Sequence, residues 1–74
     1  MSIHLRATMT SMNECVVRDP FHRTSAVVVR GSSETWETEA IGGLGGARLA
    51  DQATLHAALK AIARWGNDRV TLVG

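Results

Sequence analysis

The fold is decided by residues 42–74, which have the sequence GGLGGARLADQATLHAALKAIARWGNDRVTLVG. From Gln52 to Trp65 the residues are good helix formers, with no Gly or Pro among them. Leu55, Leu59 and Ile62 stand at positions i, i+4 and i+7, so they form one apolar stripe on such a helix. This pattern predicts an amphipathic helix that packs on a sheet.

The flanks of this helix carry their own signals. Asp51 is predicted to be its N-cap, because a carboxylate can accept hydrogen bonds from the free amides of the first turn. Gly66 is predicted to end the helix in the left-handed conformation. The glycines in 42–46 predict a loop that turns the chain from sheet to helix. Val70–Val73 predicts a strand that enters the same sheet beside an earlier one.

The first 41 residues are interpretable as sheet. Apolar and polar residues alternate over 3–9 and again over 35–41, where Trp36, Thr38 and Ala40 lie opposite Glu37, Glu39 and Ile41. Trp36 is predicted to face the core and the two glutamates the solvent. Residues 26–30 form a continuous β-branched run, expected for a central strand or one covered on both faces. Residues 15–17 either extend the first strand past a bulge or form a separate strand.

These elements predict one domain over residues 1–74. Its class is α+β, with a three- to four-stranded, mainly antiparallel sheet, one helix packed on a face, and the order β-β-β-α-β. A chain of 74 residues buries a small core, so the missing stabilisation could come from a partner or from a homodimer, and both alternatives stay open.

Composition excludes several classes of function. The net charge is only +1 and there are three aromatic residues, which argues against direct nucleic-acid binding. A single cysteine cannot form an intramolecular disulfide, which fits a reducing compartment. No signal peptide or run long enough to span a bilayer is present, so the expected location is the cytoplasm, without membrane contact.

The sequence predicts no catalytic, metal or cofactor site. Cys15 and the histidines His4, His22 and His56 lack the spacing of zinc ligands. The glycines in 42–46 lack the Gly-Lys-Ser/Thr ending of a phosphate-binding loop. We therefore expect a protein that is not an enzyme and needs no cofactor.

From residue 25 onward, the segments SAVVVRGSSETWETEAIGG and ARLADQATLHAALKAIARWGNDRVTL resemble the first half of an RNase H-like domain, including the helix opening Asp51–Leu55. Nucleases of that family hold two metal ions with clustered carboxylates. The resemblance places those carboxylates at Ala7 or Thr8, at Thr54, and after the strand Val70–Val73, where Gly74 stands. It therefore implies a shortened domain without catalytic activity.

The segment Arg64-Trp65-Gly66, followed by residues 70–74, resembles the ends of some small phage anti-CRISPR proteins. This second resemblance implies a non-enzymatic protein-binding module, a phage or mobile-element inhibitor of a host defence complex. Its partner would be a larger host protein or ribonucleoprotein complex in a bacterial cell. Two alternatives stay open: a remnant of an RNase H-like metal-dependent nuclease, and an antitoxin-like regulatory domain.

The predicted contact residues are basic. His56, Lys60 and Arg64 repeat every four residues with Gln52 and predict a basic ridge along the helix. Arg23 and Arg30 lie near predicted strand ends. The alternative interpretation of the ridge is an ordinary solvated helix face.

Overall fold

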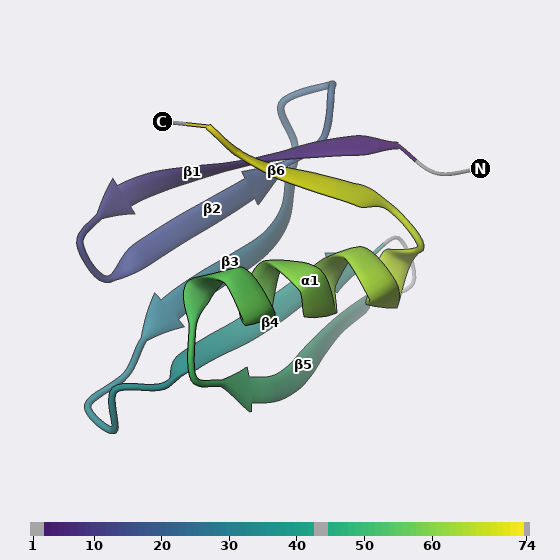
Figure 1. Cartoon of the computed structure of the whole chain (residues 1–74). Coiled ribbons are helices and arrows are strands. Elements are labelled where there is room, and N and C mark those ends of the chain that lie inside the picture. The colour runs from purple at the N-terminus through teal and green to yellow at the C-terminus, as the bar shows by residue number, and fades with distance from the viewer. Residues whose placement is uncertain (1–2, 43–44, 74) are drawn as a thin grey trace.

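The computed structural model describes residues 3–42 and 45–73, which fold into one sheet and one helix (Figure 1). The strand order across the sheet is β5-β4-β3-β2-β1-β6, in which β6 is parallel to β1 and every other neighbouring pair is antiparallel. In chain order the elements are β1 (His4–Ser11), β2 (Glu14–Arg18), β3 (Thr24–Arg30), β4 (Trp36–Gly42), β5 (Gly45–Gln52), α1 (Leu55–Gly66) and β6 (Arg69–Val73).

The α+β class and the helix packed on one face are confirmed, but the strand number is not. The sheet has six strands among the described residues, whereas three to four were predicted. One added strand is β2, which settles the open alternative for Cys15–Val17 as a separate strand. The other is β5, in a segment predicted to be loop and helix.

β5 forms because it pairs with β4. Gly42 and Gly45 face each other across the β4–β5 hairpin, and Gly46 lies opposite Ile41. The predicted turn from sheet directly into helix is therefore wrong for the described glycines, while residues 43 and 44 lie outside the described part. Glycine and alanine have low β propensity, so the pairing with β4 outweighs the local preference.

The helix begins and ends later than predicted. Its N-cap is Thr54, whose hydroxyl accepts a hydrogen bond from the Ala57 N–H at 3.1 Å. Asp51 lies in β5, so the prediction that it caps the helix is wrong. At the other end Gly66 is still helical and Asn67 adopts the left-handed conformation, with φ of 53°. Asparagine tolerates this conformation, so it can take the place predicted for glycine.

Two further hydrogen bonds close the helix. The Asp68 N–H donates to the Ala63 carbonyl at 2.8 Å, and the Asn67 N–H donates to the Arg64 carbonyl at 3.3 Å. This pair is the Schellman motif, which satisfies carbonyls at the end of a helix. The chain then enters β6, where the Arg69 N–H donates to the Ile3 carbonyl at 3.0 Å. The predicted final strand beside an earlier one is confirmed.

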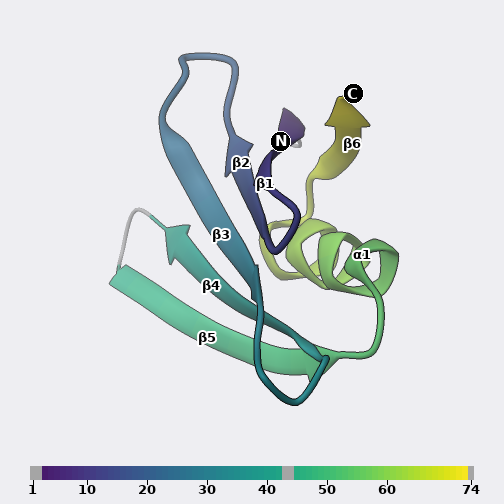
Figure 2. The ribbon, with the colours of Figure 1, turned by 90° about the vertical axis from the view of Figure 1, so that its left-hand side faces the viewer.

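The core lies between α1 and the concave face of the sheet, which curves around the helix (Figure 2). The predicted stripe of Leu55, Leu59 and Ile62 is confirmed: Leu59 and Ile62 are buried and Leu55 packs against the core. Trp36 also packs against it, whereas Trp65 is 45% exposed. The strands contribute the buried residues Leu5, Ala7, Cys15, Val17, Ala26, Val28, Thr38 and Ala40.

Candidate functional site

The candidate site lies on the convex face of the sheet, which no described helix covers (Figure 2). Side chains alternate along each strand, so residues flanking the buried positions point to this open face. Val16, Val27 and Glu39 lie side by side there on β2, β3 and β4. Val29, two residues after Val27, is 40% exposed. The open face therefore has an apolar centre.

A hollow of about 280 Å³ opens over the β3, β4 and β5 part of this face. Val27 and Val29 line it, and the charged residues Glu37, Glu39 and Arg48 stand around them. The predicted exposure of Glu37 and Glu39 on the side away from the helix is thus confirmed, with Glu39 exposed and Glu37 half-buried. The hollow combines an apolar floor with charged walls.

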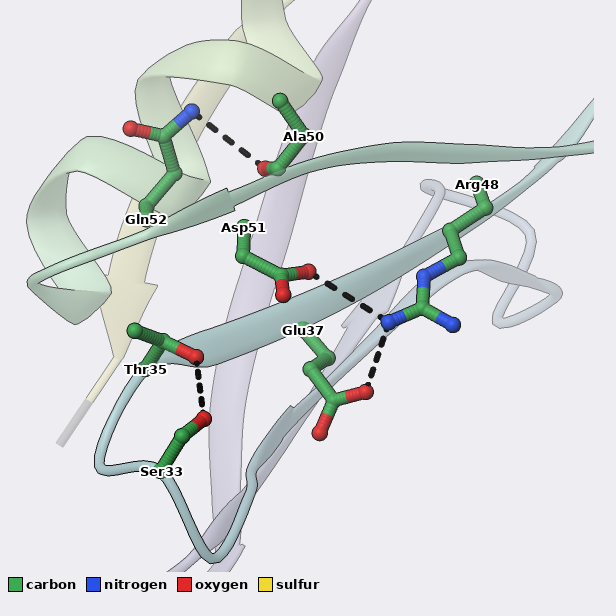
Figure 3. Close-up of polar contacts among 7 residues, drawn as sticks. All are labelled: Ser33, Thr35, Glu37, Arg48, Ala50, Asp51 and Gln52. Carbon is green, nitrogen blue, oxygen red and sulfur yellow. Dashed lines mark hydrogen bonds and ion pairs between the residues drawn. The ribbon is translucent and has the colours of Figure 1, made fainter.

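The charges around this hollow are held by ion pairs (Figure 3). The Arg48 Nη2 atom lies 2.7 Å from Glu37 Oε1 and 3.5 Å from Asp51 Oδ1. Each of the three side chains is at least 41% exposed to solvent, so these pairs contribute little to stability. Their effect is to position charge: Glu37 and Asp51 pair with Arg48, and Glu39 lies opposite Arg48 in the β4–β5 register. The hollow therefore has an excess of negative charge.

The β3–β4 turn leaves space beside Glu37. Gly31 lies in the β3–β4 turn, and a Cβ atom at that position would collide with the Glu37 carboxylate. The same turn is closed by hydrogen bonds from the Gly31 N–H to the Thr35 carbonyl and from the Glu34 N–H to the Gly31 carbonyl, both 3.0 Å. Ser33 and Thr35 hydroxyls also contact each other at 3.0 Å (Figure 3). The predicted turn at residues 31–33 is confirmed, and it leaves room for the carboxylate.

The predicted contact residues lie elsewhere. His56, Lys60 and Arg64 share the exposed side of α1, so the structure brings these three together. Gln52, predicted to begin the same ridge, lies in β5 instead. His56 and Lys60 also border a hollow of about 450 Å³ between α1 and β6.

Arg23 and Arg30 do not join that group. Arg23 comes directly before β3, and Arg30 is the last residue of that strand. The Arg23 Nε atom is 3.2 Å from Asp19 Oδ2, and its guanidinium lies 5.4 Å from the centre of the Phe21 ring. Arg30 Nη2 lies 3.9 Å from Glu34 Oε1. Both arginines are thus engaged locally.

The positions that the RNase H resemblance assigns to catalysis have other roles here. Ala7 is fully buried in the core, and the Thr54 hydroxyl caps α1.

Burial raises the pKa of the Cys15 thiol, which disfavours the reactive thiolate. Within residues 3–42 and 45–73, no three His, Cys, Asp or Glu side chains gather closely enough to hold a metal ion.

Sequence reasoning missed Arg48 and Asp51 as members of this site. Asp51 was predicted to cap the helix and Arg48 was assigned to no element, so their proximity to Glu37 was not foreseeable. The available signal was the alternation of Glu37 and Glu39, which placed two carboxylates on one face.

Among the described residues, no helix has the length and apolar character needed to cross a membrane. Comparison with protein-family models, curated proteins and solved structures gave no match.

Proposed function

We propose that this chain is a non-enzymatic protein-binding module, a phage or mobile-element inhibitor of a larger host defence complex. The observation that carries the proposal is the open sheet face, where Val27 and Val29 stand uncovered between charged side chains. Apolar residues ringed by polar ones are the usual anatomy of a protein interface. The partner would be a protein or ribonucleoprotein complex in the bacterial cytoplasm, bound through its protein surface.

The charges of the hollow favour one chemistry of partner. Two carboxylates, of Glu37 and Glu39, line the hollow with one guanidinium, that of Arg48, which also pairs with Asp51, so a cation is favoured there. The stem of an arginine or lysine can pack on Val27 and Val29 while its charged head pairs with Glu39. We therefore expect the partner to insert a basic side chain into this hollow. Nucleic acid is disfavoured at the hollow, because its phosphates would face the carboxylates.

The open face and the helix ridge are two versions of the proposal that one experiment separates. Tagged wild-type protein, Glu39→Lys and the double variant Lys60→Glu/Arg64→Glu would each capture proteins from a bacterial lysate, with quantitative mass spectrometry as the readout. A protein retained by the wild type and the helix variant but lost with Glu39→Lys supports the open face. A protein lost only with the helix variant supports the predicted ridge of His56, Lys60 and Arg64.

Glu34→Lys is the matched control, because it makes the same charge change on an exposed turn residue. Equal capture by wild type and Glu39→Lys would reject the open-face interface.

Cleavage of an RNA–DNA hybrid by the purified chain, dependent on magnesium or manganese, would reject the non-enzymatic proposal and favour the nuclease alternative. Copurification with a small toxic protein would favour the antitoxin-like alternative.

A further inference from the structure

A second hollow, of about 460 Å³, lies at the other end of the open face, over β1, β2 and β6. It is lined by donors from three separate segments: Arg6 and Thr8 from β1, Arg18 from β2, and His22 from the loop between β2 and β3. His4, at the start of β1, also lines it. Unlike the hollow at Glu37, this one is dominated by positive charge.

Arg6 and Arg18 lie directly opposite each other on neighbouring strands. Like charges in that position destabilise a sheet unless something neutralises them. Over residues 3–42 and 45–73, the ion pairs involve Arg23, Arg30 and Arg48, and neither Arg6 nor Arg18 takes part in one. Two exposed guanidinium groups thus face one hollow without a carboxylate partner in the described chain.

Asp19, which also lines the hollow, is committed to its own loop. Its Oδ1 atom accepts from the N–H groups of Phe21 and Arg23 at 2.8 and 3.0 Å, and Arg23 Nε balances the charge at Oδ2. The hydrogen bond from the Arg23 N–H is the largest cause that lowers the Asp19 pKa. The same loop holds His22 in the left-handed region, at φ of 65°, beside the hollow.

We propose that this hollow binds a phosphate group. One arginine fork is enough to satisfy the two oxygens of a carboxylate, whereas a phosphate has oxygens for both Arg6 and Arg18 at once. Thr8 adds a hydroxyl donor, and Val73 supplies an apolar wall. Free phosphate and a phosphate monoester share this chemistry. The site uses other residues than the docking hollow, so it stands independently of the proposed function.

The test is a titration of the 74-residue chain, followed by amide chemical shifts in ¹⁵N NMR spectra. The two probes are inorganic phosphate and phenyl phosphate, compared with acetate and chloride at equal ionic strength. We expect saturable shifts around Arg6 and Arg18 with both phosphates and not with acetate or chloride. Tighter binding of phenyl phosphate would identify a monoester as the ligand, and equal affinity would identify free phosphate.

Variants test the assignment to the two arginines. Arg6→Gln and Arg18→Gln should each weaken phosphate binding by about tenfold or more, because each removes a charged hydrogen-bond donor. Arg64→Gln, on the helix, should leave the affinity unchanged. Arg18→Lys keeps the charge but not the fork, and it should fall between wild type and Arg18→Gln; it also serves as the test variant if a glutamine variant fails to fold.

Three outcomes would overturn the proposal. One is a shift of the same size with acetate or chloride, which would show general attraction of anions. Another is unchanged phosphate affinity in Arg6→Gln and Arg18→Gln. The third is that the wild type sediments as a dimer, that both glutamine variants sediment as monomers, and that phosphate produces no chemical-shift changes. The two arginines would then pair with carboxylates of a second copy.

Discussion

Replacing Thr38 by valine should make this protein more stable. Thr38 lies in β4 between Val28 of β3 and Leu49 of β5, and only 1% of its surface is exposed. Its hydroxyl oxygen has no hydrogen-bond partner among the described residues. A buried polar group without a partner costs free energy on folding, because it gives up its hydrogen bonds to water. Valine has nearly the same shape and no such group.

The size of the effect follows from that burial. An unpaired buried hydroxyl costs about 1–3 kcal/mol, and imperfect fit of the new methyl group offsets part of the gain. We expect the free energy of unfolding to rise by about 1–2 kcal/mol. For a chain of 74 residues the total is about 4–11 kcal/mol, so the change is a large fraction of it. The melting temperature should rise by roughly 4–8 °C for each kcal/mol.

Urea unfolding of wild type and Thr38→Val, followed by circular dichroism, measures this difference. The slope of the transition should stay the same while the midpoint rises. Thr8→Val is the matched control: Thr8 is exposed on β1, so its replacement should change stability by no more than about 0.5 kcal/mol. A Thr38→Val variant that is no more stable than wild type, with Thr8→Val neutral, would refute the reasoning, because the hydroxyl must then be paired.

Four other predictions follow from the packing and the pKa shifts. Ile62→Ala should lower the free energy of unfolding by about 2–5 kcal/mol, because Ile62 is only 2% exposed between α1 and the sheet. Urea unfolding would measure this loss, and a much smaller loss would contradict the packing. Thr54→Ala should cost about 1 kcal/mol through loss of the helix cap, while Thr54→Ser should retain most of the stability in the same assay. The buried Cys15 thiol, with its raised pKa, should react with iodoacetamide only as fast as the chain unfolds, and rapid labelling of the native protein would contradict its burial. The pKa of Asp19 is lowered on folding, so the ionised Asp19 stabilises the folded state fully above its unfolded pKa of about 3.9. That stabilisation is lost as the pH falls through the lower pKa of the folded state. Asp19→Asn should therefore lose less stability than wild type on acidification, as measured by urea unfolding over that pH range.

Local patterns were enough to predict much of the fold. The spacing of Leu55, Leu59 and Ile62 identified the helix and its buried side, since those positions share one face at 3.6 residues per turn. The alternation around Glu37 and Glu39 identified which side of β4 faces solvent. These features depend only on neighbours in sequence.

Other features depend on partners distant in sequence. Asp51 resembles a helix cap locally, but residues 45–52 pair with β4 instead of starting the helix early. Thr54 then becomes the residue at which the helix can begin.

The candidate site shows the same division. Composition, helical spacing and strand alternation determined that the molecule is a small α+β domain, that its helix is amphipathic, and that two glutamates of one strand face outward. Only the tertiary structure brought Arg48 and Asp51 to Glu37, and Arg6 to Arg18, because strand register joins residues that lie 11 or more positions apart in the chain. The physical reason is that a strand has two faces but no preferred neighbour. Which charges share a face follows from the pairing of all six strands.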